Sequence, residues 1–241
     1  MTPFLQACTK AAVKIKKILI GGWRDEYGSR FEIGAGGDRT AGIDRVAEEI
    51  YIEVLGSFGK IDSEESGLIG SGSHRVILDP IDGSDNALSG LPYFGSSIAL
   101  EKGGRVEEAV VINLANGDIF YKGDGPLRVG RIAEERFVPV VPRRGSRLGI
   151  LERAYAYPDI AQKLYSKGVK FRSPGAVALS LAYAHYVDFV IFAGPRRSYD
   201  FAAALWMCEE LEIYEEDRLL IVSKSREMLE SLKRLVVEDK G

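Results

Sequence analysis

The chain has 241 residues, of which 46% are hydrophobic and 28% charged, with a formal net charge of −3. This near balance gives no general electrostatic reason to bind nucleic acid or an anionic membrane. The two cysteines, Cys8 and Cys208, are too few for a disulfide framework. The first residues lack the pattern of a signal peptide, and no apolar run approaches the ~20 residues of a membrane span. We therefore expect a cytoplasmic protein that forms one large domain or two lobes.

The chain uses few amides for its size. Asparagine occurs three times and glutamine twice, while glutamate, lysine and arginine are frequent. This usage is typical of proteins from hyperthermophiles, and it predicts a melting temperature above the mesophilic range.

The first half of the chain reads as helices followed by an antiparallel meander. Apolar residues three and four apart predict a helix from Phe4 to Leu19, and a second from Thr40 to Leu55. Between them, residues 24–38 carry four glycines and predict a mobile loop with room for a short hairpin. Residues 61–67 and 70–73 read as polar and turn-like. Strands are expected at Arg75–Leu78, Gly95–Glu101, Val106–Leu114, Ile119–Lys122 and Leu127–Val129.

The second half alternates strands and helices, which is typical of an α/β lobe. Strands are expected at Phe137–Val141, Leu148–Leu151, Asp188–Ala193 and Leu219–Val222. Helices are expected at Pro158–Lys167, Ala176–Tyr186, Asp200–Leu211 and Ser225–Val236. Tyr183, Tyr186 and Phe189 fit a core better than a cofactor site, and His185 reads as a packing residue. We place the lobe boundary between residues 130 and 131.

Three carboxylates follow the apolar strand that begins at Arg75. Residues 79–86 read Asp-Pro-Ile-Asp-Gly-Ser-Asp-Asn, and a short helix is expected at Ser84–Ser89. Asp79 and Asp82 could face one cleft as ligands of Mg²⁺, and free N–H groups at the helix start favour phosphate. An acidic turn with Asp-Gly chemistry is the simpler alternative for this motif taken alone. The acidic pair Glu64-Glu65 upstream and Asp200 downstream favour the metal site.

Five segments, in order, carry a resemblance to a known family. They are residues 40–44, with a helix start containing Thr and Asp; 63–65, Ser-Glu-Glu; 79–86; 172–179, Arg-Ser-Pro-Gly-Ala-Val-Ala-Leu; and 199–203, Tyr-Asp-Phe-Ala-Ala. The sequence resembles the inositol monophosphatase family of Mg²⁺-dependent, lithium-sensitive phosphatases. It is most similar to archaeal members that hydrolyse both inositol monophosphate and fructose 1,6-bisphosphate. The resemblance implies an α+β and α/β fold, a layered α-β-α-β-α sandwich, with lobes 1–130 and 131–241.

The resemblance also implies how the ions would be held. A first Mg²⁺ is expected at Glu64, Asp79 and the carbonyl of Ile81. A second is expected at Asp79, Asp82 and Asp200. The C-terminal lobe would thus contribute Asp200 to a site that otherwise belongs to the N-terminal lobe.

A third, weaker ion would involve Glu64 together with Asp38 or the 24–38 loop. The resemblance implies that Asp44 and Ser84 orient and activate the attacking water, as the catalytic residues of an in-line displacement without a phosphoenzyme. The residues expected to contact substrate are Asp82, Gly83, Ser84, Arg172, Gly175, Ala176, Val177, Arg197 and Asp200.

The sequence departs from the family at two positions, and the second departure bears on the substrate. Tyr199 replaces a tryptophan, a change expected to affect packing only. Ala193 stands where the animal inositol enzymes carry a glutamate that contacts inositol, and Arg196 and Arg197 follow it. Arginine pairs phosphates in a bidentate manner, so we expect a broad range that includes sugar bisphosphates. Simple surface charge is an equally good interpretation of the two arginines.

The expected activity is hydrolysis of small sugar or polyol phosphates, inositol 1-phosphate or fructose 1,6-bisphosphate, by a metal-activated water. The alternatives are a 3′-phosphoadenosine 5′-phosphate phosphatase, which shares the metal motifs, and a catalytically silent scaffold of the same fold. The expected partners are the phosphorylated substrate and, from the resemblance, a second copy in a homodimer, with no nucleic acid and no membrane. The sequence does not rank the substrates or predict the degree of lithium inhibition.

Overall fold

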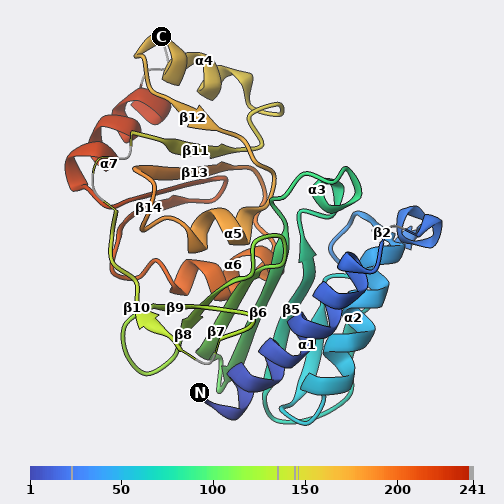
Figure 1. The fold of residues 1–241 in the computed structure, drawn as a ribbon. Coiled ribbons are helices and arrows are strands. Elements are labelled where there is room, and N and C mark those ends of the chain that lie inside the picture. Colours follow the sequence, from blue (N-terminus) through green and yellow to red (C-terminus); the bar gives the residue numbers. More distant parts are fainter. Residues whose placement is uncertain (23, 135, 144, 146, 239–241) are drawn as a thin grey trace.

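The computed structural model describes residues 1–241 except 23, 135, 144, 146 and 239–241. Helices and sheets alternate in five stacked layers, as Figure 1 shows. Helices α1 (Pro3–Ile20) and α2 (Gly42–Leu55) form the outer layer on one side. Helices α5 (Val177–Ala182) and α6 (Ser198–Trp206) form the middle layer. Helices α4 (Pro158–Ser166) and α7 (Arg226–Lys233) form the outer layer on the other side. The predicted layered α-β-α-β-α fold is therefore confirmed.

The larger sheet has eight strands in the order β10-β9-β8-β7-β6-β5-β3-β4. Their bounds are β3 (Lys60–Ser63), β4 (Gly67–Ile69), β5 (Arg75–Asp82), β6 (Gly95–Lys102), β7 (Arg105–Asn113), β8 (Asp118–Lys122), β9 (Arg128–Arg131) and β10 (Val138–Pro139). Neighbours pair antiparallel except β3 and β5, which are parallel. The predicted meander from β5 to β9 is confirmed.

The smaller sheet has five strands in the order β12-β11-β13-β15-β14. Their bounds are β11 (Gly149–Glu152), β12 (Phe171–Arg172), β13 (Phe189–Ala193), β14 (Glu212–Glu216) and β15 (Leu219–Ser223). Strand β11 pairs parallel with β12 and β13, and the remaining pairs are antiparallel. The carboxyl ends of β11 and β13 therefore lie at the same edge of this sheet.

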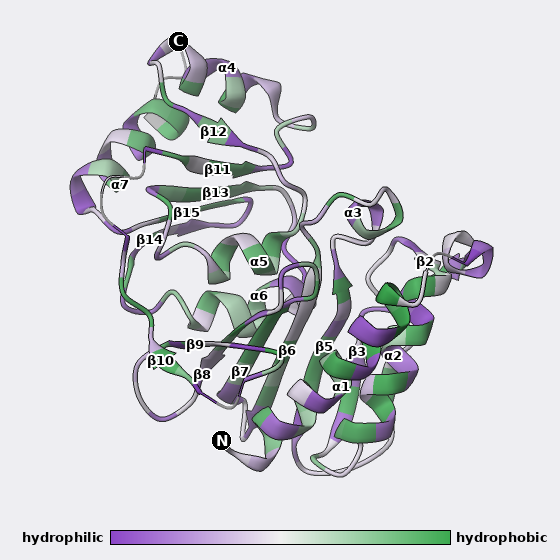
Figure 2. Ribbon diagram, in the orientation of Figure 1, coloured by the Kyte–Doolittle hydropathy of each residue, from purple (hydrophilic) through white to green (hydrophobic). Residues whose placement is uncertain are grey.

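Strand β5 shows why both faces of the larger sheet are covered. Successive side chains of a strand point to opposite faces. Val76 and Leu78 belong to the core that packs under α1 and α2, whereas Ile77 belongs to the core shared with α5 and α6. Figure 2 shows the hydrophobic colour running along the strands and the inner helix faces. The continuous apolar run that precedes Asp79 is thus the signature of a strand buried on both sides.

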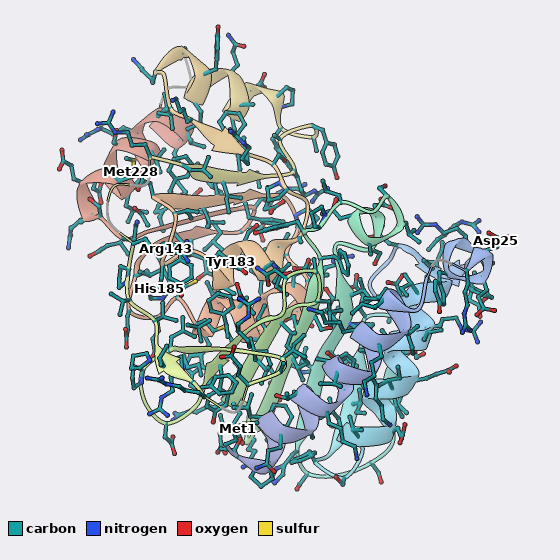
Figure 3. All side chains as sticks on the ribbon, in the orientation of Figure 1. Met1, Asp25, Arg143, Tyr183, His185 and Met228 are labelled. Atoms are coloured by element: carbon teal, nitrogen blue, oxygen red, sulfur yellow. The ribbon has the colours of Figure 1, made fainter. Side chains whose placement is uncertain are left out.

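The aromatic residues expected in the core lie in two cores: Tyr183 and Tyr186 pack against the core between the sheets, and Phe189 belongs to the core between the smaller sheet and helices α4 and α7. Phe189 is buried, and Tyr183 lies with its ring centroid 4.8 Å from that of Phe120 in an edge-on arrangement. His185 is buried, and its Nε2 lies 3.1 Å from the carbonyl oxygen of Met207. Figure 3 labels Tyr183 and His185 in this interior. The interpretation of His185 as a packing residue is confirmed. Among the described residues, no helix is both long and apolar enough to cross a bilayer.

The structure corrects several expected elements. The segment expected to be turn-like holds β3 and β4, and β14 was missed altogether. A hairpin of β1 (Arg30–Ile33) and β2 (Arg39–Ala41) confirms the possibility left open for the 24–38 loop, with a 3₁₀ turn at Asp25–Gly28 before it. Helices α5 and α6 are shorter than predicted, and α7 continues as a π-helical turn at Arg234–Glu238.

Strand β10 bears on the division of the chain into lobes. Residues 137–141 were expected to open the C-terminal lobe, but Val138 pairs with Val129 of β9 in the larger sheet. The division into lobes 1–130 and 131–241 stays a prediction, with this one strand returning to the sheet of the first lobe.

Candidate active site

A cleft of about 580 Å³ lies where the predicted motifs meet. Its walls come from the β1–β2 hairpin, the start of α2, the segment after β3, the end of β5, and the carboxyl ends of β11 and β13. Its volume is in the range of pockets that hold small ligands. The lining residues that the structure describes include nine carboxylates, Asp38, Asp44, Glu64, Glu65, Asp79, Asp82, Asp85, Glu152 and Asp200, and four arginines, Arg30, Arg39, Arg153 and Arg197.

Strand register brings the first two carboxylates together. Strands β3 and β5 pair in parallel with Ser63 opposite Leu78, and the N–H of Glu64 donates to the carbonyl of Leu78 at 2.9 Å. The next residues, Glu64 and Asp79, therefore lie side by side. The Cβ that an alanine at Gly36 would add lies 2.6 Å from Oε1 of Glu64, so the hairpin loop closes over this carboxylate.

Helix α6 places a third carboxylate, that of Asp200, beside those of Glu64 and Asp79. In β6, Ser97 lies opposite Asp79, and its hydroxyl donates to the carbonyl of Tyr199 at 3.0 Å. This contact fixes the first turn of α6 beside β5, and Asp200 follows at once. Carboxylate oxygens of Glu64, Asp79 and Asp200 all lie within 4.8 Å of one another.

The strand continues through the motif rather than ending before it, which corrects the sequence expectation that Asp79 follows the strand. Strand β5 runs to Asp82, and its register against β6 shifts between Asp79 and Asp82. Pro80 sits in this irregularity, where the missing N–H costs no ladder hydrogen bond. The carbonyl of Pro80 still accepts from the hydroxyl of Ser96 at 2.7 Å. The bulge leaves both aspartates buried at the cleft floor.

The carboxylates lie in surroundings that oppose their ionisation. Burial raises the pKa of Glu64 from 4.5 to about 8, with a further rise from Asp200. Burial also raises the pKa of Asp79 and of Asp82 well above the ordinary value, and neighbouring carboxylates add to both shifts. Burial raises the pKa of Asp200 less, since Arg197 opposes it. Buried hard oxygens with too little positive charge fit a divalent cation such as Mg²⁺.

Arg197 is the cation that contacts this cluster. Its NH1 lies 2.7 Å from Oε1 of Glu64 and 2.8 Å from Oδ2 of Asp38, and its Nε lies 3.0 Å from Oδ2 of Asp200. Burial alone would lower the pKa of Arg197, but Asp200, Glu64 and Asp38 raise it overall. The predicted substrate contact Arg197 and the predicted third-ion residue Asp38 are thus ion-paired to each other.

Asp44 and Ser84, the two predicted catalytic residues, are in direct contact. The hydroxyl of Ser84 lies 2.7 Å from Oδ1 of Asp44 and 2.9 Å from the carbonyl oxygen of Ile81. The other carboxylate oxygen of Asp44 accepts from the N–H of Ala41 at 2.9 Å, at the start of α2. Burial raises the pKa of Asp44 to about 6, although the Ser84 bond opposes the shift.

Gly83 joins this corner to the opposite wall. Its φ of 87° is left-handed, and a Cβ there would lie 3.0 Å from the Cβ of Ala176 and 3.2 Å from the carbonyl oxygen of Gly175. Only glycine meets both conditions without strain. The expected short helix, α3 (Ser84–Leu88), begins at the next residue. Gly175 and Val177 line the cleft, while Ala176 is buried behind Gly83.

Other predicted residues are not brought to the cleft lining. Arg172 lies on the edge strand β12, and its NH1 donates to the carbonyl of Phe171 at 2.9 Å. Arg196 pairs with Glu215 at 2.6 Å, away from the lining residues. Asp85, to which no role was assigned, lines the cleft as an exposed partner of Arg30 at 2.7 Å.

Several lining residues received no role from the sequence, although Glu65 belongs to the acidic pair named there. Glu65 accepts a short hydrogen bond from Thr40, and burial raises its pKa to about 7. Glu152 is fully buried and accepts from the N–H of Gly175 at 3.0 Å, while Arg153 and Tyr155 follow it along the wall. The signal was present, because a charged pair directly after the apolar residues of β11 resembles Asp79 directly after the apolar residues of β5.

The comparisons agree with this arrangement. A model of the inositol monophosphatase family matches residues 2–211. The Archaeoglobus fulgidus protein named fructose-1,6-bisphosphatase/inositol-1-monophosphatase is 30% identical over 225 residues, covering 86% of this chain and 82% of that protein. The Escherichia coli K12 protein named Nus factor SuhB is 28% identical over 223 residues, covering 87% and 83%.

Solved structures share the fold. The suhB protein of Bartonella henselae superposes with a TM-score of 0.80 at 24% identity, covering 99% of this chain and 100% of that one. An inositol monophosphatase–fructose 1,6-bisphosphatase gives a TM-score of 0.80 at 24% identity, covering 98% and 100%. The IMPase of Thermotoga maritima gives 0.77 at 23% identity, covering both chains fully.

Proposed function

The chain belongs to the inositol monophosphatase family, and we propose that it is a Mg²⁺-dependent hydrolase of small sugar or polyol phosphates. The observation that carries the proposal is the cluster of Glu64, Asp79 and Asp200, with carboxylate oxygens within 4.8 Å of one another. Asp44 and Ser84 line the same cleft. Buried acids without enough counter-charge, next to a hydroxyl–carboxylate pair, suit hydrolysis of an anionic ester.

We assign the metal-holding residues as the family resemblance implies them. Glu64, Asp79 and the Ile81 carbonyl would hold one Mg²⁺, and Asp79, Asp82 and Asp200 a second. Glu64 with Asp38 would hold a third, weaker ion. When bound, Mg²⁺ lowers the pKa of water and neutralises the charge of the phosphate.

The protein's own groups would position the reactants. A water held by Asp44 and Ser84 would form its bond to phosphorus as the bond from phosphorus to the sugar oxygen breaks. With a pKa of about 6, Asp44 is largely ionised above pH 7, so its carboxylate can accept the proton of that water. The leaving oxygen takes up a proton, which completes the release of alcohol and inorganic phosphate. The N–H groups of Gly83 and Ser84 would hold the phosphate.

The substrate range is proposed from the wall of the cleft. Ala193 offers no carboxylate for an inositol hydroxyl, so both inositol 1-phosphate and fructose 1,6-bisphosphate are candidates. The name of the Archaeoglobus relative, which joins the two activities, supports this pair. A homodimer, a thermophilic source, a cytoplasmic location and the absence of a nucleic-acid partner also remain proposals.

Two alternatives remain to be tested. A 3′-phosphoadenosine 5′-phosphate phosphatase would share the acidic cluster, and exposed Tyr155 at the cleft could contact a base. A silent scaffold of the same fold is the other, and the relatives named Nus factors make it worth testing.

Phosphate release tests the proposal directly. The purified protein would be incubated with Mg²⁺ and, separately, inositol 1-phosphate, fructose 1,6-bisphosphate or 3′-phosphoadenosine 5′-phosphate. We expect release from at least one of the first two, its loss in EDTA, and its recovery when Mg²⁺ is restored. Turnover of the adenosine compound alone would favour the first alternative, and Mg²⁺ binding without any turnover would favour the scaffold.

A further inference from the structure

Among the described residues, Arg153 is the cleft arginine without a polar partner. Of the other three, Arg30 is paired with Asp85, Arg39 donates to the carbonyl of Phe31 at 3.4 Å, and Arg197 contacts three carboxylates. Within the part of the chain that the structure describes, Arg153 forms neither an ion pair nor a side-chain hydrogen bond. A half-buried guanidinium with five unused donors, beside a cleft, is suited to receive an anion.

The backbone holds Arg153 in an uncommon conformation. Among the described residues, Arg153 is the non-glycine residue with a positive φ, which is 60°. It directly follows the last residue of β11. Its carbonyl accepts from the N–H of Ala156 at 2.9 Å, and the N–H of Ala154 donates to the hydroxyl of Ser173 at 3.1 Å. A left-handed conformation in a residue with a long side chain costs free energy and tends to occur at functional sites.

Neighbouring residues hold the guanidinium of Arg153 in place. Its carbon lies 5.9 Å from the ring centroid of Tyr157 and 6.0 Å from that of Phe192, within the range of cation–π contact. Any side chain at Gly194 would displace it, because a Cβ there would lie 2.3 Å from NH1 of Arg153. Burial raises the pKa of Asp200, and the charge of Arg153 lies near enough to oppose that rise. The cation is therefore fixed over the same cleft but outside the carboxylate cluster.

We propose that Arg153 binds a second phosphate of the substrate, remote from the one that is hydrolysed, and so favours sugar bisphosphates over monophosphates. The inference rests on the proposed phosphatase function and names the residue that would set its specificity. It assigns to Arg153 a task that the sequence had suggested for Arg196 and Arg197. Arg196 is paired outside the cleft, and Arg197 must break ion pairs before it can reach a substrate.

The kinetic test compares Arg153→Gln with the wild type on two substrates. We expect kcat/KM for fructose 1,6-bisphosphate to fall about 10–100-fold more than kcat/KM for inositol 1-phosphate, as for loss of a charged hydrogen bond. Most of the loss should lie in KM. Arg153→Lys should restore part of it, because the charge returns without the planar fork. Arg196→Gln is the matched control, and it should leave the ratio of the two substrates unchanged.

A second measurement covers the case in which substitution weakens the fold. Fructose 6-phosphate keeps the remote phosphate after hydrolysis at carbon 1, so it should inhibit the wild type more strongly than Arg153→Gln at temperatures where both are folded. Equal inhibition, or equal losses on both substrates, would overturn the assignment of Arg153 while leaving the phosphatase function intact. Turnover of neither substrate by the wild type would instead overturn the proposed function.

Discussion

We expect Asp79→Asn to abolish the stabilisation of the protein by Mg²⁺ while leaving the metal-free protein as stable as the wild type, or more so. Asp79 is buried in the middle of the acidic cluster, and Glu64, Asp82 and Asp200 each raise its pKa further. A carboxylate in such a place opposes folding unless a proton or a metal ion neutralises it. Asparagine keeps the shape of the side chain and removes the charge.

The distances give the magnitude. Two fully ionised carboxylates whose oxygens lie within 4.8 Å of one another repel by at least about 3 kcal/mol at an effective dielectric constant of 20. A bound proton relieves part of this repulsion in the metal-free state, so the gain there is smaller than full ionisation of the cluster would give. Mg²⁺ at 100 times its Kd should stabilise the wild type by about 2.7 kcal/mol. For a chain of this size that corresponds to a rise in Tm of about 5–10 °C.

Thermal unfolding followed by circular dichroism, in EDTA and in saturating Mg²⁺, measures both quantities. Asp85→Asn is the matched control, since Asp85 belongs to the same motif but its side chain is 89% exposed. The control should keep the wild-type shift with Mg²⁺. The reasoning is refuted if Asp79→Asn keeps that shift, or if its metal-free Tm falls well below that of the wild type.

Three further outcomes follow from the cleft and the core. Burial raises the pKa of Glu64 to about 8, Glu65 to about 7 and Asp44 to about 6, so the folded state binds more protons than the unfolded one. The Tm of the metal-free protein should therefore fall as pH rises from about 4.5 to 8; a Tm that rises across this window contradicts it. Arg197→Ala should tighten Mg²⁺ binding about tenfold by calorimetry, because a competing cation is lost; an unchanged or weaker affinity argues against competition. Leu179→Ala, at a fully buried core position, should cost about 2–5 kcal/mol in urea unfolding with little change in Mg²⁺ affinity, and a cost below 1 kcal/mol would contradict the packing.

The sequence predicted the meander because its strands alternate between two buried faces and are separated by recognisable turns. It did not predict β3, where Asp62 and Ser63 give a polar pattern typical of a turn. Their strand is stabilised by parallel pairing with β5, and by the ion pair of Asp62 with Arg75. Strand β14 was missed because its sequence, Glu-Ile-Tyr-Glu-Glu, carries the charges of an exposed sheet edge.

The acidic residues of the candidate site were predictable, since Asp79 and Asp82 stand three residues apart in one acidic motif after an apolar run. The contacts that these acidic residues make were not predictable from the sequence. Glu64 meets Asp79 only through the register of β3, the strand that sequence reasoning missed. Arg153 enters the cleft because of a left-handed backbone at the end of β11, and no pattern in the sequence indicates that conformation. Arg172 lies outside the cleft lining. The direction of its side chain is set by β12, a two-residue edge strand.

In this cleft, different groups would bind the reacting phosphate and a second anionic group of the substrate. With all of the described lining groups ionised, nine carboxylates face four arginines, so the cleft repels a phosphate dianion in the absence of added cations. Arg30 and Arg197 are already paired with carboxylates of the cleft, and thus add little attraction for a ligand. Binding of the reacting phosphate must then depend on cations held by the acidic cluster. An unpaired arginine outside the cluster can still attract a second anionic group, and it is this difference that makes Arg153 a determinant of specificity rather than of the reaction itself.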